Sequence, residues 1–283
     1  MDTLGKNILL IAKPFGLTSF AVTNRVKKIL HAKKAGHIGT LDPMATGLMV
    51  VALNSATRFI PYIDTDEKRY VIQIQFGIET DTDDITGSII NQKDSVVTIE
   101  EIKRVLDQFI GIIEQIPPNY SAKKFKGKPF YKYARQGEII KKKPCQVEIH
   151  KMSIVSFHSN KLVLDITCSK GTYMRSIARD MGRALGTFAT LSAITRLSIG
   201  RFCISDAATF GRIKSGDFDK GFLTADQAID LPVLFVKEAS RFKNGLDITV
   251  DKVVVRDEKG VFIGIGRHKD GKVHPEKVLN EDI

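Results

Sequence analysis

The chain has 283 residues, of which 43% are apolar and 27% charged, and its 43 lysines and arginines outnumber its 32 acidic residues. Such a composition is typical of a soluble globular protein, and the length allows one large domain and one small one. The apolar runs are far shorter than the roughly 18 residues of a membrane span. We therefore expect a cytoplasmic protein with neither a signal peptide nor a membrane span. The net charge of +11 favours a polyanionic partner, either nucleic acid or an anionic membrane face.

The cysteine and histidine pattern gives no support for a bound metal. Cys145, Cys168 and Cys203 are widely spaced without a C-x-x-C motif, and the six histidines form no H-E-x-x-H motif. Segment 81–87 comes nearest to a calcium loop, but it places Ile85 where an oxygen ligand belongs. We therefore expect no metal ion, and three reduced cysteines in a reducing compartment.

Apolar patterning predicts strands along most of the chain. Residues 48–53 are apolar without a break, which predicts a strand buried on both faces. Residues 70–76 alternate apolar and polar side chains, which predicts a half-buried strand with Tyr70 on its apolar side. By the same reasoning, further strands are expected at 7–12, near 87–90, at 147–157 and 161–169 around a turn at 158–160, and within 190–204.

Capping residues predict the helices between these strands. Thr18 or Ser19 can cap a helix that runs to about His31, and Asn54 or Ser55 can cap a short one that ends near Pro61. A capping box predicts a helix from Thr98 to about Phe109. The last predicted long helix spans 173–185, with Gly186 at its C-terminal stop.

The C-terminal part of the chain differs in its sequence pattern from the rest. Residues 205–230 have the composition of a connector with one or two short helices. From Leu231 onward, short β patterns are divided by probable turns at 257–260 and 269–272. This part is too small for a large core and is therefore predicted to be an appended β module.

Segment 117–145 interleaves aromatic and basic side chains. Tyr120, Phe125 and Phe130 lie among closely spaced lysines, and three further lysines follow at 141–143. Aromatic rings among cations suit stacking on nucleobases and neutralisation of phosphates. The alternative is a solvated basic segment whose aromatic side chains simply reach the core.

The stretch 36–47 is the strongest candidate for the functional centre. Its composition predicts an irregular loop, because three glycines supply backbone freedom and Pro43 restricts Asp42 to an extended conformation. A short carboxylate is thus held at a stiff point just before the buried strand 48–53, which is a common way to fix a catalytic side chain. The alternative is that Asp42 and Pro43 form only a turn.

Two groups of cations suggest what surrounds this loop. Arg175 falls in the first turn of its predicted helix, where a cation opposes the helix dipole, so a partner carboxylate elsewhere is expected. Lys28, Lys33 and Lys34 lie just before the loop and suit phosphate binding, although a charge run can also be a plain solvated face.

Six stretches, in order, resemble the pseudouridine synthases of the TruB type, which isomerise uridine 55 in the T arm of tRNA. Residues 39–47 match the G-x-L-D-x-x-A-x-G signature of pseudouridine synthases. The other five stretches are 13–19, 69–70 with its strand, 80–83, 120–122 and 170–175. The resemblance covers nearly the whole chain, and six motifs in one order are highly specific.

The resemblance implies both a fold and a partner. The fold is α+β, with a mixed, largely antiparallel sheet, flanking helices and a small PUA-like C-terminal domain. The implied division is a catalytic domain at 1–230, with an RNA-contacting insertion at about 117–145, and an RNA-binding module at 231–283. The implied reaction uses tRNA without a cofactor, and we expect a monomer that needs no protein partner and does not bind a membrane.

The resemblance also assigns roles to individual residues. It implies that Asp42 is the catalytic carboxylate, with Arg175 beside it to lower its pKa and keep it ionised. Four further residues are implied to contact the target nucleotide: Tyr70 by stacking, Tyr173 near the base, Leu197 as an apolar wall, and His37 in displacing the nucleotide. Lys13 and Pro14 are implied to support the floor of the site. The lysines expected to bind RNA are Lys33, Lys34, Lys123, Lys124, Lys126 and Lys128.

Two other functions remain open from the sequence. A non-catalytic RNA-binding protein or tRNA chaperone would explain the charge and the aromatic-basic segment, but not the set of Asp42, Tyr70 and Arg175. A pseudouridine synthase acting on another RNA would explain that set equally well. Mapping pseudouridine in tRNA before and after incubation separates these alternatives.

Overall fold

The large sheet is the centre of the computed structural model, which describes residues 6–94, 96–118, 120, 124–125, 128–129, 133, 142–236 and 251–279. Ten strands form this sheet, and eight follow the order β14-β1-β3-β12-β4-β11-β10-β7, with β2 beside β3 and β13 beside β12. Their bounds are β1 Lys6–Lys13, β2 Ala35–Ile38, β3 Thr46–Leu53, β4 Glu67–Phe76, β7 Gly111–Gln115, β10 Cys145–His158, β11 Lys161–Ser169, β12 Ala189–Ile199, β13 Phe202–Cys203 and β14 Phe222–Thr224.

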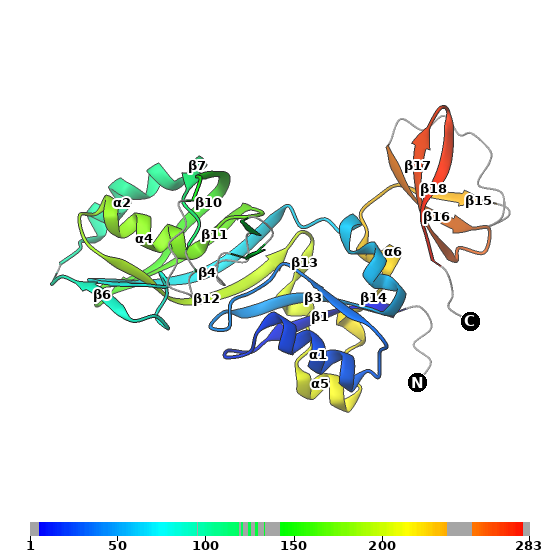
Figure 1. The fold of residues 1–283 in the computed structure, drawn as a ribbon, viewed down its shortest axis with the longest axis horizontal. Coiled ribbons are helices and arrows are strands. Elements are labelled where there is room, and N and C mark those ends of the chain that lie inside the picture. Colours follow the sequence, from blue (N-terminus) through cyan, green and yellow to red (C-terminus); the bar gives the residue numbers. More distant parts are fainter. Residues whose placement is uncertain are drawn as a thin grey trace.

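One short parallel contact joins the two halves of the sheet. Thr195 and Arg196 of β12 pair in parallel with Thr46 and Gly47 of β3, whereas the other strand pairs described in this sheet are antiparallel. Figure 1 shows this junction between the blue strands β1 and β3 and the strands β12 and β4. The predicted α+β class with a mixed, largely antiparallel sheet is confirmed.

Strands β1 and β3 are buried on both faces. One core cluster joins alternate residues of the sheet to helices α1, α2 and α4, and includes Val22, Ile102 and Ile177. A second cluster covers the other face of β1 and β3 and includes Phe59 and Ala225. The helical segments are α1 Ser19–Ile29, η1 Asn54–Tyr62, α2 Ile99–Leu106, η2 Asp107–Phe109, α4 Met174–Ala184, η3 Ile204–Asp206, α5 Phe210–Ser215, η4 Asp219–Gly221 and α6 Ala225–Ala228. Burial on both sides explains why 48–53 has no polar residue.

Several caps form where the sequence predicts them. The Thr18 hydroxyl accepts a hydrogen bond from the Ala21 amide at the start of α1. Thr98 and Glu101 form the predicted capping box of α2. Gly186 follows α4 at φ +67° and donates from its amide to the Arg183 carbonyl, as expected for a helix stop.

Three local predictions are wrong. Residues 36–38 belong to strand β2, which pairs with β3, so the irregular loop shrinks to 39–45. Neither Asn54 nor Ser55 caps the next helix, because Leu53 occupies the N-cap and the Asn54 side chain instead accepts hydrogen bonds from the amides of Lys33 and Lys34. The connector 205–230 also contains β14, which extends the sheet beside β1.

The C-terminal residues form a separate four-stranded sheet, as predicted, in the order β15-β16-β17-β18. Its strands are β15 Val233–Val236, β16 Lys252–Asp257, β17 Phe262–Lys269 and β18 Lys272–Val278. Val254 and Ile265 join the second core cluster, and the Phe262 ring contacts the Phe59 ring edge-on at 5.1 Å between centroids. The small sheet is therefore packed on the η1 side of the larger one (Figure 1).

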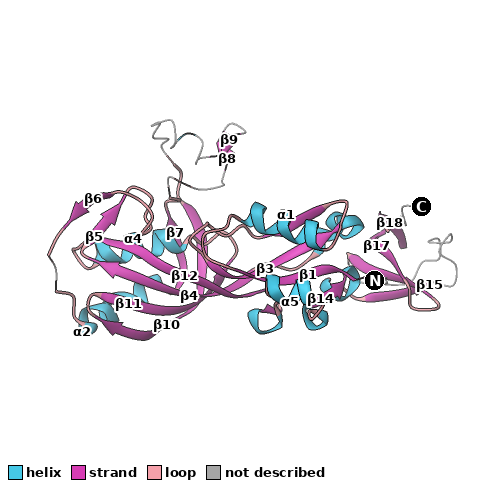
Figure 2. Ribbon diagram, turned by 90° about the horizontal axis from the view of Figure 1, so that it is seen from below, coloured by secondary structure: helices cyan, strands magenta, loops and turns pink. Residues whose placement is uncertain are grey.

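Two short hairpins lie outside both sheets. One pairs β5 Ile78–Thr80 with β6 Ile89–Gln92, and the other pairs β8 Lys124–Phe125 with β9 Lys128–Pro129. Figure 2 shows the β8–β9 hairpin standing clear of the large sheet. In the described part of the chain, the helices are all too short or too polar to span a membrane.

Glu276 is predicted to stabilise the packing of the C-terminal sheet. It accepts hydrogen bonds from Arg267 at 2.7 and 3.1 Å and from the Tyr62 hydroxyl at 3.0 Å, and the Arg267 bond is the main reason why its pKa falls to about 2. Because the folded pKa lies below the ordinary value of 4.5, this contribution is complete above that pH and is lost as the pH falls towards 2. We expect Glu276→Gln to lower Tm at pH 7, and the difference from the unaltered protein to vanish near pH 2.

The control is Glu258→Gln, which changes an exposed glutamate in the turn between β16 and β17. It should leave Tm unchanged across the same pH range. A Glu276→Gln protein whose Tm equals that of the control at pH 7 would rule out this role.

Candidate active site

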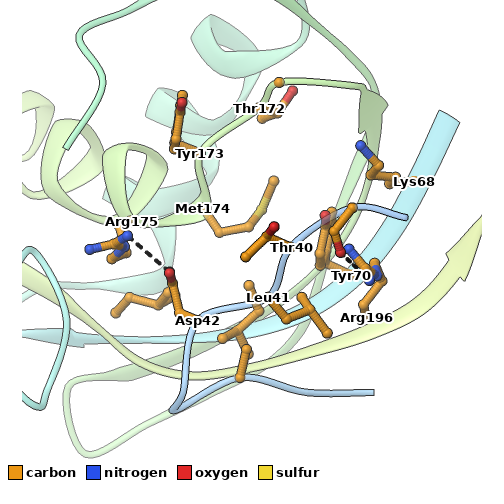
Figure 3. Close-up of a pocket in the computed structure, with 15 residues that line it drawn as sticks. Thr40, Leu41, Asp42, Lys68, Tyr70, Thr172, Tyr173, Met174, Arg175 and Arg196 are labelled. Atoms are coloured by element: carbon orange, nitrogen blue, oxygen red, sulfur yellow. Dashed lines mark hydrogen bonds and ion pairs between the residues drawn. The ribbon is translucent and has the colours of Figure 1, made fainter. Parts of the chain in front are cut away.

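A cavity of about 240 Å³ opens at the junction of the two halves of the sheet. It is lined by the 39–45 loop, by β4 and β12, and by the residues that lead into α4 (Figure 3). Asp42 is its carboxylate, and three of its lining residues are cations: Lys68, Arg175 and Arg196. The lining is therefore net positive, which suits a ligand that carries negative charge.

Side chains of segment 13–19 hold the Asp42 loop in place through hydrogen bonds to its backbone. The buried Lys13 ammonium donates to the carbonyls of Pro14 and Pro43, both at 3.1 Å, and of Ala45 at 2.5 Å. The Ser19 hydroxyl donates to the Leu41 carbonyl and accepts from the Leu41 amide. Asp42 is thus fixed on both sides by backbone contacts. These contacts support the structural role predicted for Lys13, whose pKa burial lowers to about 8.

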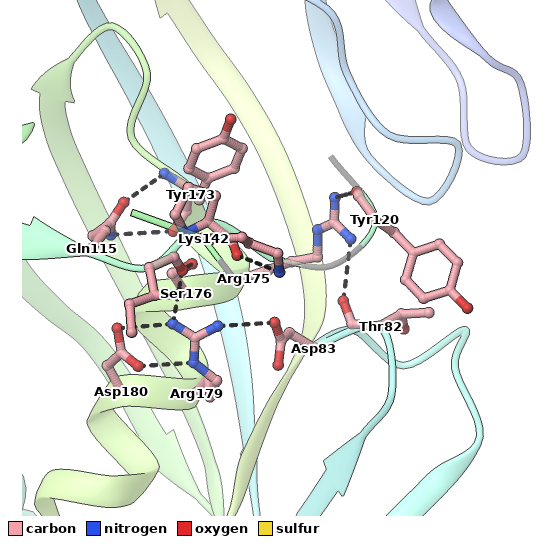
Figure 4. Close-up of polar contacts among 12 residues, drawn as sticks. Thr82, Asp83, Gln115, Tyr120, Lys142, Tyr173, Arg175, Ser176, Arg179 and Asp180 are labelled. Atoms are coloured by element: carbon pink, nitrogen blue, oxygen red, sulfur yellow. Dashed lines mark hydrogen bonds and ion pairs between the residues drawn. The ribbon is translucent and has the colours of Figure 1, made fainter. Parts of the chain in front are cut away.

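Arg175 is the partner of Asp42. Its Nη2 lies 2.9 Å from Asp42 Oδ2, and its side chain is only 7% exposed. The same guanidinium donates to the carbonyls of Thr82 at 3.1 Å and Tyr120 at 2.6 Å (Figure 4). Its Nη1 also lies 3.6 Å from Asp84 Oδ2. Asp42 is therefore the partner carboxylate that the position of Arg175 in the first helical turn led us to expect. Asp84 is a second carboxylate near the same guanidinium.

Arg175 lowers the pKa of Asp42, as expected, but it does not bring that pKa below its ordinary value. Loss of solvation raises the pKa of Asp42, and this effect exceeds the lowering by Arg175, with Asp84 raising the pKa further. The Asp42 side chain is nevertheless 46% exposed, so its carboxylate faces the open part of the cavity. Asp42 is a more basic carboxylate than a free aspartate, and Arg175 limits the increase in its pKa.

The 80–84 loop anchors the start of α4. The Asp84 carboxylate accepts from the Thr82 hydroxyl at 3.0 Å and from the Thr86 amide at 3.0 Å. Asp83 pairs with Arg179, one turn after Arg175, at 3.1 Å. Two successive arginines on one face of α4 are therefore held by two adjacent aspartates. The loop fails the calcium pattern and serves instead as a support for arginine side chains.

Tyr70 lines the cavity beside a buried arginine that sequence analysis did not identify. The Tyr70 side chain is 7% exposed, and its hydroxyl is hydrogen-bonded to the guanidinium of Arg196 (Figure 3). Arg196 is 1% exposed and also donates to the carbonyls of Leu48 and Gly39, both at 2.8 Å. The sequence signal for Arg196 was weak, since one arginine within an otherwise apolar strand pattern identifies no specific role.

Tyr173 lines the cavity and is the N-cap residue of α4. Its amide donates to the Gln115 side-chain oxygen at 3.0 Å, and its carbonyl accepts from the Gln115 side-chain nitrogen at 3.3 Å. Gln115, at the end of β7, is 1% exposed. The buried amide thus fixes the backbone of Tyr173, and with it the entry to α4 (Figure 4).

Leu197 and His37 are not among the residues that line the cavity. Leu197 is the extra residue of a bulge in β12, because Arg196 pairs with Tyr70 and Ser198 pairs with Arg69, the preceding residue of β4. The apolar lining of the cavity consists of Leu191 and Ile194, together with Leu41, Ala45 and Met174 of the other lining elements. The place of Leu197 as an apolar wall beside the site remains a prediction.

His37 lies on β2 rather than in a loop, and its ring nitrogens contact two threonine hydroxyls. Nδ1 is 3.1 Å from the Thr23 hydroxyl, and Nε2 is 3.4 Å from the Thr40 hydroxyl. Burial lowers the pKa of His37, and the Arg196 charge lowers it further. His37 is thus adjacent to the cavity through Thr40, and its predicted contact with the nucleotide remains a prediction.

The lysines predicted to bind RNA differ in how far the structure describes them. Lys33 and Lys34 are exposed and lie between α1 and β2. Lys123 and Lys126 lie outside the described residues, and only the backbone of Lys124 and Lys128 is described. Within the described ranges, no group of three or more histidines, cysteines and acidic residues is placed to hold a metal ion.

The cavity places one carboxylate among cations, an arrangement that suits a ligand rich in negative charge. Residues 27–174 match the family described as TruB family pseudouridylate synthase (N terminal domain). The chain belongs to this family, whose members are isomerases. The tRNA pseudouridine synthase B of Caldanaerobacter subterraneus subsp. tengcongensis is 37% identical to the chain, and the match covers 96% of this chain and 98% of the relative. The tRNA pseudouridine synthase B of Thiobacillus denitrificans is also 37% identical, over 96% of this chain and 95% of the relative.

Solved structures share the fold across the whole chain. A chain of a Cbf5-Nop10-Gar1 complex superposes with a TM-score of 0.72 at 23% identity, covering 98% of this chain and 85% of that one. A chain of an H/ACA RNP bound to a substrate RNA containing 2'-deoxyuridine gives a TM-score of 0.72 at 22% identity, with 98% and 86% coverage. At this identity the likeness concerns the fold alone.

Lys13 is predicted to stabilise the protein through the Asp42 loop. Lys13→Met keeps the volume of the side chain but removes the donor from three carbonyls, and each buried unpaired group is costly. We expect a loss on the order of 2–5 kcal/mol in the free energy of unfolding, measured by urea denaturation. Lys214→Met, at an exposed site in α5, is the control and should change little. Equal stability of the two variants would show that the Lys13 contacts contribute nothing.

Proposed function

We propose that this chain isomerises uridine to pseudouridine at position 55 in the T arm of tRNA, with Asp42 as the essential carboxylate. The observation on which this rests is the ion pair between Asp42 and Arg175 in a cavity lined by Tyr70 and Tyr173. A non-catalytic RNA-binding protein would not need a raised-pKa carboxylate held against a buried guanidinium.

The single carboxylate suits an isomerisation better than a hydrolysis. Hydrolytic glycosidases typically place two carboxylates around the scissile bond, one of them to protonate the leaving group or to activate water. In this cavity Asp42 is the carboxylate among the lining residues, and Asp84 lies behind Arg175. Attack on the sugar, attack on the base and abstraction of a sugar proton all require Asp42 in its ionised form. Arg175 favours that form.

The remaining lining residues suit a nucleotide that has left the RNA stack. An enzyme that acts on a base within folded RNA must first rotate it into a pocket, where an aromatic face can replace the lost stacking. Tyr70 supplies a ring held at a fixed position, and Tyr173 supplies a second ring on the lining. Lys68, also on the lining, is placed to interact with the negative charge of the nucleotide, and burial lowers its pKa.

We propose tRNA as the macromolecular partner. The net charge of +11 and the exposed Lys33 and Lys34 beside the site favour a phosphate-rich ligand. Relatives that match nearly the whole chain are named tRNA pseudouridine synthase B. In this proposal residues 1–230 form the catalytic domain, the insertion at about 117–145 grips the RNA, and the small sheet within 231–283 adds a further contact.

Asp42→Asn tests the proposal most directly. The change keeps the size and most hydrogen bonds of the side chain but removes its charge, and asparagine suits a turn as well as aspartate does. We expect pseudouridine formation to stop while tRNA binding persists, because phosphate contacts lie elsewhere. The measurement is single-turnover pseudouridine formation on saturating tRNA transcript, with the modified position mapped and binding measured separately.

Two controls accompany this test. Asp217→Asn changes an exposed aspartate that pairs with Arg212 on α5, and it should retain full activity. A transcript with cytidine in place of uridine 55 should acquire no pseudouridine. Product formed by a folded Asp42→Asn protein would refute the role of Asp42, and product at another position would refute the assignment to uridine 55.

The pH dependence of the rate should respond to Arg175. Arg175 lowers the pKa of Asp42 against the larger effect of burial, so Arg175→Gln should raise that pKa further. Since the ionised form is the active one, the acid limb of the single-turnover rate should move to higher pH in this variant. Arg175→Lys keeps the charge but loses the planar fork, so it should slow the reaction with a smaller movement of the limb. An acid limb that stays in place or moves to lower pH in Arg175→Gln would contradict this account.

A further inference from the structure

Arg196 is a fully buried guanidinium whose partners are not carboxylates. Its side chain is 1% exposed, and among the described residues no carboxylate lies within ion-pair distance of it. Its bonds go to the carbonyls of Leu48 and Gly39 and to the Tyr70 hydroxyl. An isolated buried charge is costly, and removal of its solvation lowers the pKa of Arg196 itself. A group maintained at this cost, on the wall of the cavity, requires a functional explanation.

The contacts of Arg196 enclose the Asp42 loop at both ends. Its Nη2 bonds the carbonyl of Gly39, where the loop begins, and its Nε bonds the carbonyl of Leu48, just after the loop ends. The backbone of Arg196 packs so closely on Gly47 that a Cβ there would lie 2.3 Å from the Arg196 carbonyl oxygen. A Cβ on Gly39 would lie 3.1 Å from Arg196 Nη1. Both terminal glycines of the signature 39–47 therefore make room for this one residue.

The third contact fixes the Tyr70 ring on the wall of the cavity. A guanidinium has donors and no acceptor, so the Tyr70 oxygen must accept from Arg196. This bond holds the Tyr70 hydroxyl, and with it the ring that lines the cavity, at one position. Arg196 therefore sets the position of the ring that is proposed to stack on the target base.

We propose that Arg196 is a positioning residue of this active site, which fixes the Asp42 loop at both ends and holds the Tyr70 ring in place on the cavity wall. It acts through Asp42 and Tyr70 rather than on the reacting atoms. This inference rests on the proposed role of Asp42 in catalysis. It extends that role by naming the residue that keeps the carboxylate and the stacking ring at a fixed position relative to each other.

The first test replaces Arg196 and measures binding and chemistry separately. Arg196→Met removes the charge and all donors, whereas Arg196→Lys keeps the charge and some donors. We expect the single-turnover rate of pseudouridine formation to fall about 100-fold in Arg196→Met, the effect of a misplacement of about 1 Å, and less in Arg196→Lys. The Kd for tRNA should stay within about threefold, because phosphate contacts provide most of the affinity. Arg69→Met, on the opposite, exposed face of β4, is the control and should react at the normal rate.

The second test asks whether Arg196 acts through Tyr70. If the two residues act independently, the fold losses of Arg196→Met and Tyr70→Phe should multiply in the double variant. If Arg196 acts partly through the Tyr70 hydroxyl, the double variant should lose far less than the product. Full multiplication of the two losses would overturn the Tyr70 part of the proposal.

The third test leaves Arg196 in place, and so remains informative if its replacement prevents folding. Gly39→Ala places a Cβ against Arg196 and Ile199, and Gly186→Ala is a matched control with the same φ of +67° and open space around its Cβ. Backbone strain should be similar in the two variants, so only Gly39→Ala should reduce the single-turnover rate. Equal rates for both glycine variants, or an Arg196 variant that folds and reacts normally, would overturn the proposal. Total pseudouridine is measured in each case, so these outcomes do not depend on which uridine is modified.

Discussion

The ion pair between Asp42 and Arg175 is the contact on which the rest of the site depends. It joins a loop that enters β3 to the first turn of α4, two elements more than 130 residues apart in the chain. The pair lies where the two halves of the large sheet meet through the parallel contact of β3 and β12. The ion pair therefore forms only when the two halves of the sheet are correctly assembled, because a shift of either half would separate the two charges.

The charged side chains around this site are buried, so other polar groups must offset their loss of solvation. Arg175, Arg179 and Arg196 are all nearly buried, and each is stabilised in a different way. Arg175 and Arg179 each lie close to an aspartate of the 80–84 loop, and each also donates a hydrogen bond to a backbone carbonyl. Among the described residues, Arg196 donates only to backbone carbonyls and to the Tyr70 hydroxyl. The cavity therefore keeps an excess of positive charge that an incoming nucleotide can neutralise.

Sequence patterning predicted those features that depend on local physics. The apolar run 48–53, the capping box at Thr98 and the stop at Gly186 follow from burial and backbone geometry within a few residues. The need for a carboxylate near Arg175 followed from its place in the first turn of a helix. The identity of that carboxylate as Asp42 was implied by the family resemblance rather than by any local pattern.

The missed features depend on pairing between distant segments. A bulge in β12 interrupts the strict alternation of side chains at Leu197, and this bulge exists only through the register of β12 on β4. The same bulge leaves Arg196 opposite Tyr70, where it faces inward. β2 was read as loop because its glycine-containing sequence has weak strand propensity, and its pairing with β3 overrides that propensity.

The first two turns of α4 link the ion pair of Asp42 and Arg175 to the segment that we propose grips RNA. The Arg175 guanidinium bonds the Tyr120 carbonyl, and the Arg179 guanidinium and the Ser176 hydroxyl both bond the Ile116 carbonyl. The ammonium of Lys142, where the chain returns from this segment, donates to the Pro117 carbonyl at 2.9 Å. The start of the segment is therefore bound to α4, and its end is bound to its start. A displacement of Tyr120 would act directly on the guanidinium that limits the Asp42 pKa, so a ligand that moves this segment would also change the ionisation of the carboxylate.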